Sequence, residues 1–378
     1  MLDEKPSQRD IVDVTPLFEP LTVKGITLKN RFVLAGMQRF ACSEGRPLPS
    51  MVEFFRSRVE GGVAMVMTEA CAVDHPSATQ EAKYAWVTEA TLDAWAKCAD
   101  AVKGEGGHLI IQLWHEGAFR AEGGDGPYAR YPTISPSGLF GPDKKRGVPA
   151  SLQDLEDIKA AFVRSALGAQ QIGASGVEIH VSGGYLLDAF VWPETNLRTD
   201  KYGGDLNARL RYPAEIVTAV RAAVGPDFLI SCRLSQWKRE AVDARGLAAN
   251  PEELEIVVKT LEQAGVEMFQ PGAWKFWEPE WPGSDLSIAG WIKTFTSSPV
   301  VAVGGVGLDA DILDNYAGVE SKFSKDVLQK AVDCFQAGQF DLLAVGRALI
   351  CEPAWVNKVR EGRYDEIHPF LKEKLYEM

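Results

Sequence analysis

Three polar side chains stand at or next to the ends of short apolar runs in the sequence: Gln112, His180 and Arg233. Such runs are typical of buried strands. In a parallel β/α barrel the carboxyl ends of all strands meet at one face, where the loops build the site. A lone His or Gln there is more often structural, but an amide, an imidazole and a guanidinium together favour a ligand-binding site.

Glycines follow two further runs near the C-terminal end of the sequence. Gly304 and Gly305 close one run, and Gly346 with Arg347 closes the other. Exposed backbone amides and a guanidinium bind phosphate, and the last two loops of a β/α barrel are the usual place for it. The alternative is that these glycines serve only tight turns. The shared character of both loops favours a phosphate site.

The elements that must position these residues follow one alternating pattern. Between the apolar runs lie amphipathic stretches, of which residues 151–173 are the clearest: Ser151 serves as N-cap, with Asp154 three residues on. Strands alternating with helices predict βα units around a parallel sheet. We predict eight strands, at residues 32–36, 64–70, 109–114, 176–180, 228–234, 266–271, 299–305 and 341–347.

Eight such units close most simply into a (β/α)8 TIM barrel with inserted loops, an α/β fold. The alternative, a doubly wound sheet, requires a glycine fingerprint after its first strand, and the residues after 32–36 lack one. We expect a single domain over 1–378 with its core at about 15–365. The insertions at 115–150 and 306–321 belong to the strand-end loops.

The composition sets the class of protein. The chain of 378 residues is 46% hydrophobic and 24% charged, as in ordinary globular proteins. A net charge of -12 argues against nucleic acid or an anionic membrane surface as partner. The basic run from Lys144 to Arg146 is typical of a solvated loop face. No run reaches the roughly 18 apolar residues of a membrane-spanning helix, and the charged N-terminus does not resemble a signal peptide.

Six cysteines are scattered without a CxxC pair. This spacing argues against a zinc site, an iron-sulfur cluster or a disulfide framework, so we expect no metal. Reduced thiols are typical of a cytoplasmic protein.

One long segment carries a resemblance to a known family. Residues 176–217 contain VEIH, GYL, N-R-T-D-x-Y-G-G and R-x-R in that order, too polar and aromatic for an ordinary loop. This succession resembles the most specific motif of the old yellow enzyme family. Residues 17–37, 109–117, 231–235 and 342–355 match further family motifs, so the resemblance spans roughly 15 to 365.

The resemblance implies an FMN-dependent oxidoreductase that uses NADPH or NADH to reduce activated alkenes such as α,β-unsaturated carbonyls. It places Arg233 beside the N1/C2 end of the flavin, where a cation stabilises the reduced ring. It assigns the flavin edge, pyrimidine and phosphate contacts to Ala35, Gly36, Met37, Gln38, Ala70, Gln112, His180, Gly304, Gly305, Gly346 and Arg347.

The resemblance also implies roles toward the substrate, a small electrophilic alkene. Tyr185 matches the tyrosine that protonates the α-carbon while the flavin N5 delivers hydride to the β-carbon. His180 matches one of two side chains that bind the carbonyl oxygen, and Trp114 and Gln38 line the pocket. The alternative for Tyr185 is a core tyrosine with a satisfied hydroxyl.

Three positions depart from the family pattern. The second carbonyl anchor, a His or Asn in the family, is Gly183, so one donor is missing. Gly36 replaces a proline, and Gln38 replaces the Thr or Cys that tunes the flavin. These departures leave open a member that runs another flavin reaction, such as dehydrogenation or demethylation, or a flavin-binding protein with little turnover.

A third alternative is a flavin-free phosphate-binding barrel such as a lyase. The sequence places no lysine on a barrel strand for Schiff-base chemistry, which disfavours it. The sequence leaves the oligomeric state open, a homo-oligomer included.

Overall fold

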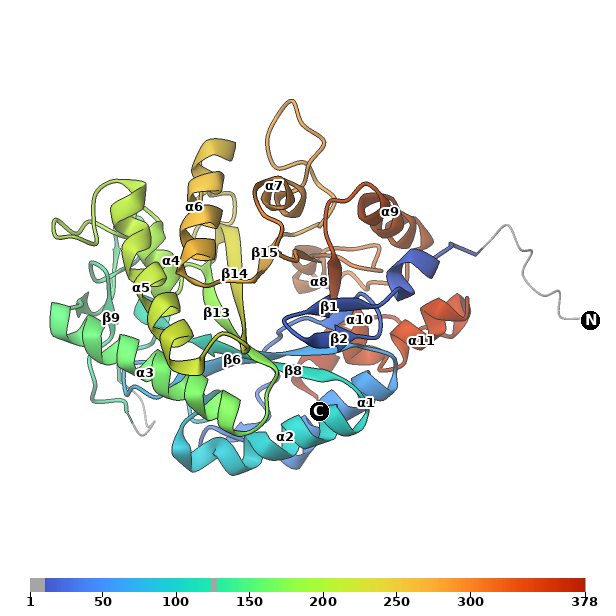
Figure 1. Ribbon diagram of the computed structural model, residues 1–378, viewed down its shortest axis with the longest axis horizontal. Coiled ribbons are helices and arrows are strands. Elements are labelled where there is room, and N and C mark those ends of the chain that lie inside the picture. Colours follow the sequence, from blue (N-terminus) through green and yellow to red (C-terminus); the bar gives the residue numbers. More distant parts are fainter. Residues whose placement is uncertain (1–10, 124–127, 378) are drawn as a thin grey trace, which may run out of the picture.

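Eight parallel strands form a closed barrel surrounded by helices in the computed structural model, which describes residues 11–123 and 128–377 (Figure 1). Neighbouring strands follow the order β3-β17-β16-β15-β14-β13-β8-β6, and β6 pairs with β3 to close the barrel. The barrel strands are β3 (Phe32–Leu34), β6 (Met65–Val73), β8 (His108–Trp114), β13 (Gly176–Gly183), β14 (Leu229–Lys238), β15 (Met268–Gly272), β16 (Val301–Val303) and β17 (Leu342–Val345). All eight predicted strands and the TIM-barrel fold are confirmed, and closure excludes the doubly wound sheet.

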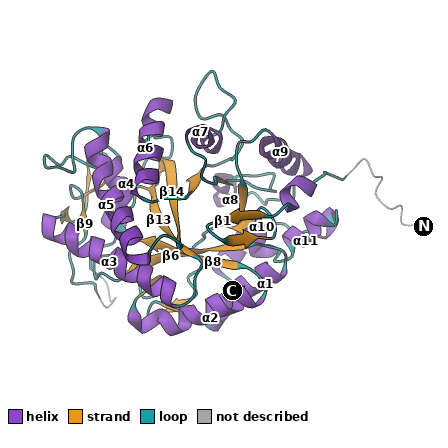
Figure 2. Cartoon of the chain, in the orientation of Figure 1, coloured by secondary structure: helices purple, strands orange, loops and turns teal. Residues whose placement is uncertain are grey.

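The helices lie outside the strands, as Figure 2 shows. Their apolar faces pack against the barrel, as expected of amphipathic segments between buried strands. The helices are α1 (Pro49–Glu60), α2 (Leu92–Gly104), α3 (Leu152–Gln171), α4 (Leu186–Val191), α5 (Leu206–Val224), α6 (Pro251–Ala264), α7 (Ile288–Phe295), α8 (Ile312–Tyr316), α9 (Lys325–Gln336), α10 (Arg347–Cys351) and α11 (Trp355–Arg360).

The start of α3 is fixed by a reciprocal cap, as its sequence predicts. The Ser151 hydroxyl accepts a bond of 3.1 Å from the backbone N–H of Asp154, and the Asp154 carboxylate accepts one of 2.8 Å from the N–H of Ser151. Two N–H groups that lack helical partners are thereby satisfied.

A hairpin of β1 (Leu21–Val23) and β2 (Ile26–Leu28) closes the amino end of the barrel. Val23 and Leu28 are buried in one cluster with inward-facing residues of the barrel strands, among them Met65 and Met268. The opposite, carboxyl end is therefore the end at which a ligand can enter.

The strands that carry the expected site residues extend further than predicted. β13 and β14 pair beyond His180 and Arg233, which lie opposite each other, and a register shift then brings Gly183 opposite Lys238. β16 is shorter than predicted and ends at Val303, because Gly304 and Gly305 take positive φ angles of 134° and 66°.

The remaining strands are short. β7 (Ala85–Val87) extends the barrel sheet beside β6, and the others form pairs in the loops: β4 (Cys42–Ser43) with β5 (Arg46–Pro47), β9 (Ile134–Ser135) with β12 (Val148–Pro149), and β10 (Leu139–Gly141) with β11 (Lys144–Lys145).

All six cysteines are free thiols. Within the described ranges, no helix has the length and apolar character to span a membrane, and no group of metal-ligating side chains is assembled.

Candidate active site

A cavity of about 200 Å³ opens at the carboxyl ends of the barrel strands. Its walls contain residues from two sets that the family resemblance kept apart: those expected at the edge of the flavin and those expected at its phosphate. Of the predicted cofactor residues, the cavity is lined by Ala35, Gly36, Met37, Arg233, Gly304, Gly305, Gly346 and Arg347.

Two of the lining glycines are required by close backbone packing. A Cβ on Gly36 would lie 2.6 Å from the carbonyl oxygen of Thr68, and one on Gly304 would lie 2.2 Å from that of Ala273. Both distances are shorter than any real contact of this kind. Gly36 stands where the family resemblance predicts a proline. It therefore presents only main-chain atoms to the cavity.

Arg233 is held in place by a residue that the sequence did not single out. Its Nη1 donates to the Oε1 of Gln270 on β15 over 2.7 Å, and Gln270 is buried. Burial lowers the pKa of Arg233, and Glu178 opposes the effect. A guanidinium nevertheless stays charged in proteins, so the cavity wall carries a fixed positive charge.

Gln112 is oriented by a second such residue, Glu178. The amide Nε2 of Gln112 donates to the Glu178 carboxylate over 2.6 Å, and Ser231 donates to the same carboxylate over 3.4 Å. This Nε2 also lies 3.0 Å from the position that a Cβ of Gly36 would take, so Gln112 adjoins the cavity. Ala70 is the strand partner of Gln112 between β6 and β8.

Three of the predicted catalytic and substrate residues, Tyr185, His180 and Trp114, form one aromatic cluster. The Tyr185 ring contacts those of His180 and Trp114 edge-on, with centroid distances of 5.2 and 5.1 Å. Burial, together with the charge of Arg233, lowers the pKa of His180 to about 3, so its imidazole is neutral. Burial raises the pKa of Tyr185, and Arg239 opposes it, so the phenol keeps its proton at neutral pH.

Three buried nitrogens of the predicted site have no hydrogen-bond partner among the described residues: Gln38 Nε2, Trp114 Nε1 and His180 Nδ1. Buried polar groups in native proteins nearly always have partners. None of the three side chains lines the cavity itself, but His180 is the strand partner of Arg233, which does. Trp114 and His180 both contact the Tyr185 ring, so their unpaired nitrogens indicate a polar ligand at that ring.

Gly183, the expected position of a second anchor, presents only backbone beside Tyr185 and Trp237. Its φ is 69°, and a Cβ there would meet nothing closer than 3.5 Å, from Trp237 and Tyr185. The next cation is Arg239, whose backbone N–H donates to the Gly183 carbonyl over 3.2 Å and whose Nη1 donates to the Tyr185 hydroxyl over 2.8 Å. No pattern in the sequence points to Arg239, because its contacts with Tyr185 arise from the pairing of β13 with β14.

The start of α4, where Tyr185 lies, is fixed by a buried ion pair. Lys238 and Asp188 are both fully buried and lie 2.7 Å apart. The other oxygen of Asp188 accepts the backbone N–H of Gly184 over 2.6 Å. Since Gly184 precedes Tyr185, this pair connects the position of the tyrosine to the end of β14.

Arg347 lines the cavity but is turned partly toward the insertion at 306–321. Its Nη1 donates to the carbonyl of Ala310 over 3.1 Å and to the side chain of Asn315. The insertion therefore helps to set the orientation of the guanidinium at the predicted phosphate end.

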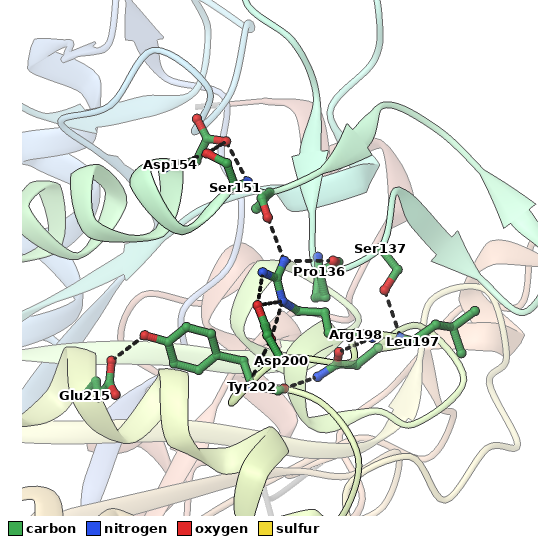
Figure 3. Close-up of polar contacts among 11 residues, drawn as sticks. Pro136, Ser137, Ser151, Asp154, Leu197, Arg198, Asp200, Tyr202 and Glu215 are labelled. Atoms are coloured by element: carbon green, nitrogen blue, oxygen red, sulfur yellow. Dashed lines mark hydrogen bonds and ion pairs between the residues drawn. The ribbon is translucent and has the colours of Figure 1, made fainter.

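The N-R-T-D-x-Y-G-G stretch fastens two loops together (Figure 3). Arg198 donates to the carbonyl of Ala150 over 2.6 Å and lies 2.5 Å from Asp200, while the N–H of Leu197 donates to Ser137 over 2.8 Å. Tyr202 donates to Glu215 over 2.8 Å. These contacts join the β13 loop to the insertion at 115–150, so this stretch has a structural role in holding the two loops together.

A larger cavity, of about 660 Å³, lies elsewhere, between α1 and the C-terminal segment. It includes Arg39, Phe54 and His368 but none of the predicted site residues. We assign the site to the smaller cavity, because it lies at the carboxyl ends of the barrel strands and is lined by the glycines that end β16 and β17.

A closed barrel of this kind, with glycines at its last strand ends and polar groups below them, belongs to the class of barrels that bind phosphorylated cofactors. The match to a family model identifies the family within this class. Residues 16–315 match the model of the NADH:flavin oxidoreductase / NADH oxidase family. The chain belongs to this family, that of the old yellow enzymes.

Individual proteins of known name are similar to the chain over nearly its whole length. The chain is 28% identical over 366 residues to a metal reductase of Desulforamulus reducens, covering 94% of this chain but only 50% of that protein. It is 26% identical over 357 residues to an NADPH dehydrogenase of Bacillus subtilis, covering 93% and 96%. The chain thus spans half the length of one relative and nearly all of the other.

Solved structures share the fold. An old yellow enzyme homologue from Zymomonas mobilis superimposes with a TM-score of 0.77 over 95% of this chain and 96% of that one, at 21% identity. This likeness supports the barrel architecture.

Proposed function

We propose that the chain is an NAD(P)H-dependent ene-reductase that uses FMN to reduce the alkene of an α,β-unsaturated carbonyl compound. The observation that carries the proposal is the contact between the neutral His180 imidazole and the protonated Tyr185, at the mouth of a barrel of this flavin family. A hydrogen-bond donor and a general acid side by side are what conjugate reduction requires.

The residues present fit FMN. Gly304, Gly305, Gly346 and Arg347 would hold its phosphate, and partnerless Gln38 Nε2 would gain an acceptor at the ring. Arg233 would lie beside the pyrimidine with Gln112, and Ala35, Gly36, Met37, Ala70 and His180 would complete the contacts. When bound, FMN supplies the two-electron chemistry: it accepts hydride from NADH or NADPH and returns it to the alkene.

The side chains of this chain would perform the remaining tasks. His180 donates to the substrate carbonyl and polarises the alkene, and Tyr185 gives its proton to the α-carbon. Trp114, packed edge-on against Tyr185, excludes water from that side. We further propose that the domain acts on small molecules in the cytoplasm, in keeping with its free thiols.

The test begins with the visible spectrum of the purified protein, which should show flavin bands in the blue. Rapid mixing with NADPH and with NADH, followed by 2-cyclohexenone, should then bleach the flavin and restore it. A protein that stays colourless after reconstitution with FMN would overturn the assignment of the cofactor. Flavin that is reduced by a nicotinamide but never reoxidised by any enone would overturn the assignment of the substrate.

A further inference from the structure

Two guanidinium groups from different loops lie on the aromatic cluster that contains Tyr185. Arg239, which follows β14, stands over the rings of Phe119 and Tyr185, 4.9 and 5.6 Å from their centroids. Arg146, from the insertion at 115–150, stands 4.3 Å from the centroid of Phe140. The ring of Phe119 contacts those of Tyr185 and Phe140 at 5.5 and 6.0 Å, so both cations belong to one cluster.

Neither guanidinium has a carboxylate partner in the part of the chain that the structure describes. Arg239 donates to the Tyr185 hydroxyl over 2.8 Å, and Arg146 donates to the carbonyl of Phe119 over 3.2 Å. By contrast, two lysines close to them in sequence are paired with carboxylates: Lys144 with Glu240 and Lys238 with Asp188, each at 2.7 Å.

The carboxylate of Glu116 acts on Arg239 only through space. Glu116 is buried, and its Oε2 accepts the hydroxyl of Thr79 over 2.8 Å. The remaining N–H groups of Arg239 are therefore available to a ligand, and its side chain is exposed.

We propose that Arg239, assisted by Arg146, selects activated alkenes that carry a carboxylate. This inference rests on the proposed function and names its substrate class. The planar N–H fork of a guanidinium matches the two oxygens of a carboxylate. Rings that cover one face of each guanidinium remove competing water and fix its plane, which strengthens the attraction.

The charge of the whole protein adds to the argument. A chain with a net charge of -12 repels anions in solution, so an anionic substrate needs a local positive field to reach the site. Arg239 and Arg146 provide that field beside the proposed proton donor. The bond to Tyr185 also uses the oxygen of the hydroxyl as acceptor and leaves its proton free for the substrate.

The experiment compares trans-4-oxo-2-pentenoate with its methyl ester, which differ in one negative charge. We expect Arg239→Gln to lower kcat/KM for the acid about tenfold more than for the ester, chiefly through KM, with Arg239→Lys intermediate. Arg146→Gln should shift the same ratio about threefold. Lys145→Gln, which removes an exposed charge next to Arg146, is the matched control and should leave the ratio unchanged.

An acid-to-ester ratio that is the same in wild type and Arg239→Gln overturns the proposal. If both substrates slow equally in that variant, Arg239 acts on Tyr185 alone and the carboxylate site does not exist. Thermal melting of each variant shows that it is folded.

A binding measurement separates this proposal from failure of the reductase activity. Oxidised protein is titrated with 4-hydroxybenzoate and its methyl ester, followed by tryptophan fluorescence, with no turnover. We expect the acid to bind about tenfold more tightly in wild type and to lose this advantage in Arg239→Gln. Equal affinities in wild type, or tighter binding of 4-hydroxybenzenesulfonate than of 4-hydroxybenzoate, overturn the carboxylate assignment even if no enone is reduced.

Discussion

The amide of Gln112 donates a hydrogen bond of 2.6 Å to the buried carboxylate of Glu178, inside the barrel. Because the amide nitrogen is engaged there, the orientation of Gln112 is set, and its oxygen is the atom that remains for a ligand. Glu178 lies two residues before His180 on β13, so both point to the same face of the strand. The proposed flavin site thus has a negative group beneath it as well as the positive group of Arg233.

This pair of charges predicts opposite effects on the flavin potential. Burial raises the pKa of Glu178, and Arg233 opposes the rise by stabilising its charge. We expect Glu178→Gln to raise the reduction potential of bound FMN by roughly 30 mV, about 1.4 kcal/mol for two electrons, because a negative charge near the reduced ring is lost. Arg233→Ala should lower it, with Arg233→Lys milder, as measured by equilibration with reference dyes. No change in Glu178→Gln would show that this carboxyl is uncharged.

The pH dependence follows from His180 and Tyr185. The pKa of His180 is lowered to about 3, so the neutral imidazole persists down to that pH, while the raised pKa of Tyr185 keeps its proton in place as the pH rises. We expect the rate of flavin reoxidation by an enone to be flat from about pH 5 to 9 and to fall only above the ordinary tyrosine pKa of about 10. If the rate instead changes as the pH is lowered from 7 to 6, His180 becomes protonated in the ordinary range for histidine, and its pKa is not lowered.

Tyr185→Phe tests the proton donor. We expect flavin reduction by the nicotinamide to stay near the wild-type rate, and reoxidation by 2-cyclohexenone to slow by about 10²–10⁴-fold, the usual contribution of a general acid. Rapid-mixing absorbance measures both steps separately. If both keep their wild-type rates, another group or water donates the proton.

The fold could be predicted because each barrel strand carries its own signal. A short apolar run between amphipathic stretches marks every strand, and the cap of Ser151 with Asp154 marks the start of α3. The ends of strands were less predictable. Gly304 and Gly305 are apolar enough to continue β16, but their positive φ angles end it, whereas pairing between β13 and β14 carries both strands past their apolar runs.

The site could be predicted only where a residue stands at a strand end or in a motif. Gln270 is at a strand position, but its role appears only through the bond to Arg233 on the neighbouring strand. Arg239 is 54 residues from Tyr185, and no spacing in the sequence relates the two. The motif residues Arg198 and Asp200 hold one loop to another, a role that the sequence does not reveal, because a polar loop that binds a ligand and one that binds another loop have the same composition.

Gly183 gives the most specific prediction. A carbonyl oxygen that gains negative charge during hydride transfer is stabilised by preorganised donors, and each donor is worth about 10²–10³-fold in rate. The φ of 69° at Gly183 strains any side chain but is tolerated better by Asn than by His, and the nearest atoms to a new Cβ lie at ordinary contact distances of 3.5 Å or more, so Asn is the residue to introduce at this position. We expect this variant to reoxidise its flavin with 2-cyclohexenone at least about tenfold faster than wild type. Reduction by the nicotinamide should change far less, because it forms no such oxyanion.

Gly183→Ala is the control for Gly183→Asn, since it also places a Cβ on the left-handed backbone but adds no donor, and thermal melting of both variants measures the strain that each introduces. Rapid mixing of each reduced protein with the enone measures the step directly. If Asn and Ala have the same effect, a side-chain donor at this position does not act on the carbonyl. If wild type already reduces cyclohexenone rapidly and both variants only slow it, the second donor is not missing. The side chain of Arg239, whose Nη1 donates to the Tyr185 hydroxyl over 2.8 Å, would then be the group to replace next.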